Sequence, residues 1–268
     1  MINKKRFKSY IIHSSKKFNL KPNQIILSGK HPVQAALNNK SRKLHYLLSN
    51  QDNFQFWEEY IQNLNLNIDI KIKTREELDL INNYQPHQNS ILVTEPLDRI
   101  SLDEFLFAKR LTTHVPLRII ILDQVTDPQN VGAIIRSAYA FKMNAIALSQ
   151  TNSPGESSSM AKASSGAIEK IKIIELSNMA REIKKLQYAN FSVYGLAFGG
   201  NKTILDLENE KGNIAIIVGS EGKGLRRLTK EKVDQLLEIS INEDSESLNV
   251  ANAASITMFQ LQKNIIKN

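Results

Sequence analysis

Two short, nearly unbroken apolar runs constrain the fold of this chain most strongly. Residues 117–122 read LRIIIL and residues 214–218 read IAIIV. Such runs, rich in β-branched residues, are typical of strands that are covered on both faces, as in a parallel sheet. Amphipathic segments separate these and further apolar runs, and parallel strands need crossovers of that kind. The second half of the chain is therefore predicted to be an α/β domain with a mostly parallel sheet.

The first half repeats this alternation over a shorter length. Apolar runs at residues 25–27, 44–48, 68–72 and 90–93 predict strands, and the amphipathic stretches between them predict helices. Thr74 and Glu77 have the spacing of a capping box ahead of the third helix. This order predicts a small α/β domain. We expect a basic arm over residues 1–22, the small domain over 23–97, a linker over 98–115 and the larger domain over 116–268.

Composition narrows the partners and the compartment. The formal net charge of +8 favours a polyanionic partner, although an overall lysine bias would produce the same excess. The absence of cysteine excludes disulfides and thiolate metal sites. No apolar run approaches the about 20 residues of a membrane helix, so a cytoplasmic location is expected. The basic, acid-free residues 1–18 favour a flexible arm over the alternative of an organellar transit peptide.

The loop over residues 123–132 follows the first apolar run. Ligands of open α/β sheets bind beyond the carboxyl ends of strands, so this position is informative. Asn130 is predicted to cap a helix that begins near Gly132. Arg136 follows within that helix, at a position suited to an anion. A capping asparagine and a surface arginine explain the same residues without a ligand.

The loop over residues 218–225 is rich in glycine. Its spacing GxxGxG differs from the dinucleotide fingerprint GxGxxG, and no Ser or Thr follows Lys223 as a phosphate-binding loop requires. Glu221 would repel a phosphate, which favours a ligand with hydroxyl, ammonium or sulfonium groups. A plain glycine turn is the alternative.

The loop over residues 239–250 is acidic within a basic chain. Ser247 and Asn249 both lie where the last helix is predicted to begin, and capping needs only one of them. The acidic residues alone indicate no more than solvated charge.

The order of these loops carries a resemblance. LDQVTDPQNVGAIIRSA, IVGSEGKGLRRLT and ISINEDSESLNVANAASI resemble the three motifs of the SpoU (TrmH-like) family of RNA ribose 2′-O-methyltransferases in the SPOUT superfamily. The segment SSGAIE at residues 164–169 is similar to a further family segment. Gly29, His31, the Arg42-Lys43-Leu44 run and His87-Gln88 resemble the substrate-binding domain of the rRNA guanosine branch. The resemblance covers residues 24–265.

The resemblance implies a SPOUT domain with a trefoil knot and an L30e-like N-terminal domain. It also implies S-adenosylmethionine as methyl donor, a homodimer that includes the helix at 251–265, and RNA, with a guanosine of 23S rRNA as target. No metal ion or membrane is implied. By resemblance, the catalytic site residues are Asn130, Arg136, Glu221, Ser247 and Asn249. The cofactor contacts are Gly219, Ile239, Ile241 and Leu248. Candidate RNA contacts, for which a solvated surface is the alternative, are Lys30, His31, Arg42 and Lys43.

Several positions depart from the family pattern. The family usually has proline at Ser240, glycine at Glu243 and at Asn89, and serine-valine at Ala251-Asn252. Ser240 and Glu243 are expected to change the rigidity of the cofactor loop. Asn89 concerns RNA binding only.

The expected chemistry depends on positioning, because the sulfonium already makes the methyl group electrophilic. We expect Arg136 to hold a phosphate and polarise the 2′-hydroxyl, since an arginine is hard to deprotonate. Ser247 and Asn249 would orient the hydroxyl, and Glu221 would shape the pocket. The alternatives are a tRNA ribose methyltransferase and a non-catalytic RNA-binding or ribosome-assembly protein. The glycine spacing disfavours a nicotinamide dehydrogenase.

Overall fold

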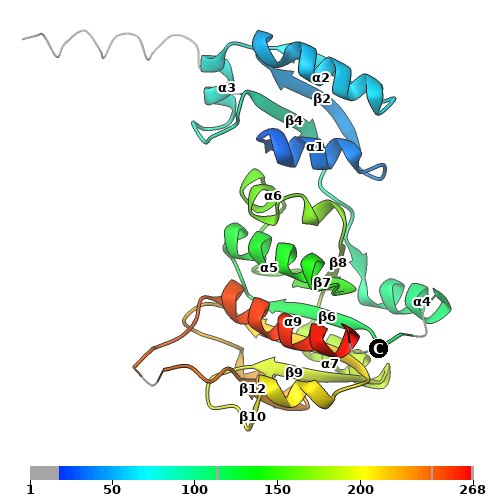
Figure 1. The fold of residues 1–268 in the computed structure, drawn as a ribbon, viewed down its shortest axis with the longest axis vertical. Coiled ribbons are helices and arrows are strands. Elements are labelled where there is room, and N and C mark those ends of the chain that lie inside the picture. Colours follow the sequence, from blue (N-terminus) through cyan, green and yellow to red (C-terminus); the bar gives the residue numbers. More distant parts are fainter. Residues whose placement is uncertain (1–17, 113–114, 243, 267–268) are drawn as a thin grey trace, which may run out of the picture.

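The computed structural model describes residues 18–112, 115–242 and 244–266. Most of the predicted basic arm and Glu243 lie outside the described residues. The described chain forms two α/β units, a small one above a larger one in the view of Figure 1.

The small unit contains four strands that alternate with three helices, as predicted. Thr74 and Glu77 form the predicted capping box, with each side chain bonded to the other's backbone N–H. The strands lie in the order β1-β4-β2-β3; β4 is antiparallel to β1 and β2, and β2 is parallel to β3. Buried Trp57 donates from Nε1 to Ser90 Oγ (3.0 Å) across this core. The elements are β1 (Ile25–Ser28), α1 (Lys30–Asn38), β2 (Leu44–Ser49), α2 (Gln51–Asn63), β3 (Asp69–Ile72), α3 (Arg75–Ile81) and β4 (Ser90–Thr94).

The larger unit is built on one sheet whose strand pairs are all parallel in the described part of the chain. The order is β10-β12-β9-β11-β6-β7-β8-β5. The predicted buried strands are β6 (Arg118–Asp123) and β11 (Asn213–Gly219), which pair at the middle of the sheet. The other strands are β5 (Ile100–Ser101), β7 (Ala145–Ser149), β8 (Lys172–Leu176), β9 (Phe191–Leu196), β10 (Lys202–Thr203) and β12 (Gln235–Glu238). This confirms the mostly parallel α/β domain; the trefoil knot stays a prediction.

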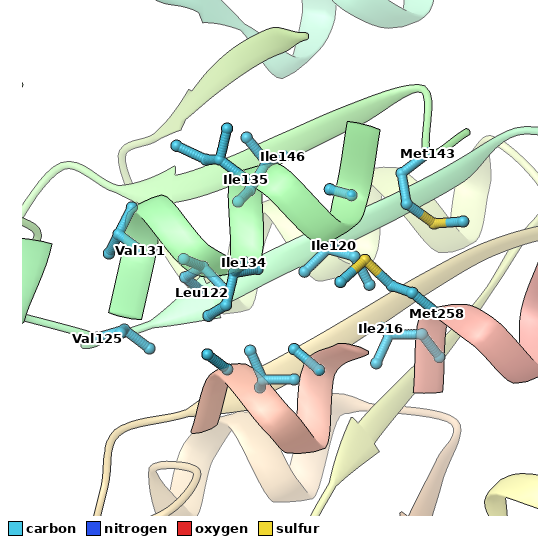
Figure 2. Close-up of a cluster of buried hydrophobic side chains, with 14 of the residues drawn as sticks. Ile120, Leu122, Val125, Val131, Ile134, Ile135, Met143, Ile146, Ile216 and Met258 are labelled. Carbon is cyan, nitrogen blue, oxygen red and sulfur yellow. The ribbon is translucent and has the colours of Figure 1, made fainter. Parts of the chain in front are cut away.

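Helices cover both faces of the sheet. The helices are α4 (Leu102–Thr112), α5 (Pro128–Ala140), α6 (Ser158–Ser164), α7 (Met179–Tyr188), α8 (Arg227–Lys232) and α9 (Val250–Ile266), with short 3₁₀ helices η1 (Ala167–Glu169) and η2 (Ile204–Asn209). Figure 2 shows one core, in which Ile134 of α5 and Met258 of α9 meet Ile120, Leu122 and Ile216 of the central strands. On the opposite face of the sheet, helices α4 and α7 pack in a second apolar cluster with buried side chains of the strands. No helix among the described residues is long and apolar enough to cross a bilayer.

The predicted linker at residues 98–115 is largely part of the larger unit. Strand β5 pairs with β8 at the edge of the sheet, and Leu102 and Phe105 of α4 are buried in its core. The linker prediction was wrong for this segment, because its apolar side chains find burial against the neighbouring sheet.

Candidate active site

The three predicted loops meet at one edge of the sheet. From β6 the chain adds β7 and β8 on one side, then returns to place β9, β11 and β12 on the other side of β6. The pair β6–β11 is thus the topological switch point, where ligands of parallel sheets bind beyond the carboxyl ends. The loops after β6, β11 and β12 all leave from that edge.

A cavity of about 530 Å³ opens between the loops after β11 and β12. It is lined by all four residues expected to hold the cofactor and by two of the expected catalytic residues, which are Gly219, Ile239, Ile241, Leu248, Glu221 and Ser247. Lining residues that the sequence did not indicate come from the end of β9, the loop after it and α8, and include Leu196, Phe198 and Lys230. The position of Phe198 just beyond the carboxyl end of a predicted strand is the sequence feature that could have indicated its place in the cavity wall.

Gly219 is required by the shape of its own loop. The loop folds back so that Ser220 pairs with Gly224. A Cβ at Gly219 would lie 2.1 Å from the carbonyl carbon of Gly224, so no other residue fits without a backbone shift. Gly222 and Gly224 both have positive φ angles, 78° and 62°, which favour glycine.

Asn249 brings three expected catalytic residues together. Its Nδ2 donates to Asn130 Oδ1 (3.0 Å) and to Glu221 Oε1 (2.5 Å). Its Oδ1 accepts from the backbone N–H of Ala251 (2.9 Å) at the start of α9. Because this capping bond fixes the oxygen, the amide group can point only its donors towards the other two side chains. Three residues, one from each loop, therefore form a connected polar cluster.

Asn130 is available to this cluster because it does not cap α5. The carboxylate of Asp127 accepts from the N–H groups of Gln129 (3.0 Å) and Asn130 (3.3 Å), and Pro128 is the first helical residue. The predicted helix start near Gly132 was therefore wrong by one turn. Asp-Pro is a recognised start signal, with the acceptor at the cap and proline at the first position.

Arg136 and Ser247 are not joined to the cluster. Arg136 is exposed, and its spacing of four from Gly132 places both on one face of α5. Within the described part of the chain, the Arg136 guanidinium has no ion-pair or hydrogen-bond partner. Ser247 is exposed at the cavity wall.

Asp123 is a buried residue of this site that the sequence did not single out. Its Oδ2 accepts from Thr229 Oγ1 (2.7 Å), and its Oδ1 lies 2.7 Å from Arg226 Nη2. These bonds tie the end of β6 to the segment after the glycine loop. A charged residue ending an apolar strand run was the signal for it.

The candidate RNA contacts of the small unit divide into two groups. Lys30, His31 and Lys43 are exposed, and the Lys30 ammonium lies 3.7 Å from the centre of the Phe56 ring. Arg42 is buried and pairs with Glu156 and Glu169 of the larger unit, each at 2.6 Å. Burial alone would lower the pKa of Arg42, but hydrogen bonds and charge from these two carboxylates raise it. The prediction that Arg42 contacts RNA was wrong, because its donors are used inside the protein.

Asn89 occupies a left-handed backbone position, with φ of 53°. Asparagine tolerates this conformation better than most residues, which explains how it can replace the usual glycine. The preceding His87 is buried, with Nε2 2.9 Å from Asp79 Oδ1. Ser240 is exposed, while any effect of Glu243 falls outside the described residues.

Comparison with known proteins matches this geometry to a family. The model of the SpoU rRNA methylase family matches residues 117–259, more than half of the chain. The chain belongs to the SpoU rRNA methylase family. Residues 26–99 match a second model, described as RNA 2′-O ribose methyltransferase substrate binding. The small unit is therefore a substrate-binding domain of this type, and the larger unit is the methylase domain.

Individual relatives carry more specific names. A 23S rRNA (guanosine-2′-O-)-methyltransferase of Coxiella burnetii is 33% identical over 241 residues, covering 88% of this chain and 94% of the relative. One of Xylella fastidiosa is 40% identical over 142 residues, and the match spans 57% of that relative. Among solved structures, the SpoU methyltransferase AviRb of Streptomyces viridochromogenes with AdoMet has a TM-score of 0.77 at 17% identity, covering 92% of each chain. An AdoMet-bound rRNA methyltransferase of Sinorhizobium meliloti has a TM-score of 0.73 at 19% identity, covering 91% of this chain and 88% of that one. These two likenesses show the fold.

Proposed function

We propose that this protein transfers a methyl group from S-adenosylmethionine to the ribose 2′-hydroxyl of a guanosine in 23S rRNA. The observation that carries the proposal is the cluster of Asn130, Glu221 and Asn249, in which Glu221 also lines the cavity. The name of the Coxiella relative supports the rRNA guanosine as substrate, and the AdoMet bound to AviRb supports the cofactor.

The cavity fits the proposed cofactor in size and chemistry. Its volume of about 530 Å³ is within the usual range for small-molecule sites. Ile239, Ile241 and Leu248 supply apolar walls for an adenine ring, and the Glu221 carboxylate suits a positively charged group. Bound S-adenosylmethionine would supply an electrophilic methyl group on a sulfonium centre.

The side chains of the chain would then position the nucleophile. Arg136, exposed beside the loop after β6, would bind the phosphate next to the target ribose through its fork of N–H donors. Ser247 and the fixed amide of Asn249 would orient the 2′-hydroxyl. Alignment of this kind can supply up to about 7–11 kcal/mol of barrier reduction.

A homodimer through the larger domain is part of the proposal. Ile256 and Phe259 of α9 are 40% and 50% exposed, although both are large and apolar. The Phe259 ring packs edge-on against Phe141 (5.9 Å between centres) and extends the apolar surface to the end of α5. A second copy would cover this surface, and ribosomal RNA as substrate makes the cytoplasm the expected compartment.

The test is methyl transfer from labelled S-adenosylmethionine to unmodified 23S rRNA, with tRNA in parallel, followed by mapping of the modified ribose. Label in one 23S guanosine supports the proposal. Label in tRNA alone would keep the chemistry and overturn the substrate. Failure to bind the cofactor and to label either RNA would indicate a non-catalytic RNA-binding protein.

Arg136 gives the first mutational prediction. Arg136→Ala should abolish labelling, while Arg136→Lys should keep part of it, because a lysine retains the charge without the bidentate fork. The measurement is kcat/KM for the rRNA. The Kd of the cofactor is measured in parallel, and neither substitution should alter that Kd. Equal loss in both variants would contradict phosphate binding by charge.

A further inference from the structure

The helix α6 lies between the two domains (Figure 1). On one side it packs against α5, where a Cβ at Gly132 would lie only 2.5 Å from the Met160 carbonyl oxygen. On the other side Ala161 is buried in the apolar core of the substrate-binding domain. Ser158 Oγ also donates to the carbonyl of Ile26 in β1 (3.0 Å). Packing is thus continuous from the substrate-binding domain through α6 to the helix that carries Asn130 and Arg136.

A buried ion cluster holds the two domains together at both ends of α6. Arg42 comes from the substrate-binding domain, whereas Glu156 precedes α6 and Glu169 follows it in η1. Arg42 Nη2 lies 2.6 Å from a carboxylate oxygen of each glutamate, and Arg42 Nε donates to Glu169 Oε2 (2.9 Å). The three side chains are only 0%, 5% and 3% exposed.

The remaining polar atoms of this cluster are also bonded. Arg42 Nη1 donates to the carbonyl of Glu95 (2.9 Å). The second oxygen of Glu156 accepts from the N–H of Leu97 (2.8 Å), and Glu169 Oε2 accepts from Asn39 Nδ2 (2.8 Å). A buried arginine with this many directed bonds has a single orientation, and so do the segments that supply its partners.

Removal of the arginine would leave two buried carboxylates without a counter-charge. Breaking a buried ion pair by removing one partner is strongly destabilising, because the remaining charge cannot reach water. The nearest relief is separation of the two domains, which would expose both glutamates.

We propose that Arg42 is a positioning residue that sets which ribose of the bound RNA reaches the catalytic loops. It fixes the substrate-binding domain on α6, and so fixes the distance between the RNA held there and the Asn130–Glu221–Asn249 cluster. The inference rests on the proposed function, since it assumes that RNA is held by one domain and modified by the other. Arg42 acts through this geometry and touches neither RNA nor cofactor.

The first test measures the interdomain distance. Because the chain contains no cysteine, Glu58→Cys in α2 and Lys184→Cys in α7 provide two unique, exposed sites for spin labels. Labelled chains are diluted in an excess of unlabelled chains, so that each proposed dimer holds one labelled copy. Pulsed electron paramagnetic resonance should then give a narrow distance distribution in the otherwise unchanged chain and a broad one with Arg42→Ala. Lys40→Ala is the matched control, because it also removes one positive charge, from an exposed side chain close to Arg42 in the sequence. It should leave the distribution narrow.

The second test measures selectivity. Arg42→Ala should lower kcat/KM for 23S rRNA by about 100-fold and spread the label to neighbouring riboses, because a misplacement of about 1 Å has consequences of that size. The Kd of S-adenosylmethionine should not change. Should Arg42→Ala fail to fold, Glu156→Gln removes one charge and keeps only one of the two hydrogen bonds that Glu156 accepts, from Arg42 Nη2 and from the N–H of Leu97, so it should give intermediate broadening.

The two hypotheses fail in different ways. A narrow distribution and an unchanged modification site in a folded Arg42→Ala protein would overturn the positioning inference, even if thermal stability falls. Absence of methyl transfer by the unchanged protein would overturn the proposed function, while the distance measurement would still report on the ion cluster.

Discussion

Asn249 serves the fold and the site with opposite ends of one amide group. Its oxygen caps α9, and its nitrogen donates to Asn130 and Glu221. The motif comparison identified Asn249 as a site residue, but the bonds that hold it join residues 119 and 28 positions away, which sequence patterns do not reveal.

Asn249→Asp separates these two functions. Aspartate keeps the capping oxygen but replaces the donor with an acceptor that faces the Glu221 carboxylate, so the two side chains should repel each other. We expect helix content to persist and methyl transfer to fall by about 100-fold, as for other misplaced site groups. Circular dichroism and kcat measurements would check this; unchanged kcat would exclude a positioning role for the Asn249 donor.

Gly219 gives a second prediction at the scale of single residues. In Gly219→Ala the new Cβ would meet the Gly224 backbone at 2.1 Å, so the glycine loop must move. Overpacking of this kind typically costs about 1–3 kcal/mol of unfolding free energy. A lower Tm and weaker S-adenosylmethionine binding by calorimetry are expected. Gly212→Ala, which has open space and no strained φ, is the control and should change neither.

At the scale of elements, strands were easier to predict than helix boundaries. The apolar runs identified β6 and β11 because burial on both faces leaves a clear pattern. The sequence did not predict the short α6. Its seven residues contact a different domain on each side, so the apolar positions show no helical period. The predicted start of α5 lies one turn late because both Asn130 and the Asp-Pro pair before it carry helix-start signals, and the pair is the one that caps the helix.

The cap of α5 is testable on its own. Asp127→Ala removes the acceptor for two N–H groups and should lower the free energy of unfolding by about 1 kcal/mol. It should also lower kcat, because Asn130 lies in the same first turn. Asp127→Asn keeps an acceptor oxygen and should approach the unchanged protein in both chemical denaturation and kcat. Equal behaviour of the two variants would mean that the cap does not hold Asn130.

At the scale of the whole molecule, the two-domain plan followed from the sequence but the contact between the domains did not. Arg42 belongs to a run of basic residues beside the exposed Lys43, so it was grouped with surface charges. Its partners lie 114 and 127 positions further along the chain. Only the folded structure brings them to one place.

Assembly of the whole molecule gives the last prediction. Ile256→Asp places a charge within the exposed apolar surface of α9 and should convert a dimer into monomers by light scattering, because burial of an unpaired carboxylate is unfavourable. Tyr188→Asp, at an 87% exposed position of α7, should leave the molar mass unchanged. A monomeric mass for the unchanged protein would overturn the proposed homodimer.

The placement of Glu156 and Glu169 on either side of α6 has a consequence for how such enzymes diversify. The methylase domain supplies two buried glutamates, and the substrate-binding domain needs to supply only one arginine that contacts both of them. A different substrate-binding domain with an arginine at the equivalent position would bind the methylase domain in the same orientation, without any change to the catalytic loops. New target sites could then arise by exchange of a module, with the chemistry inherited intact.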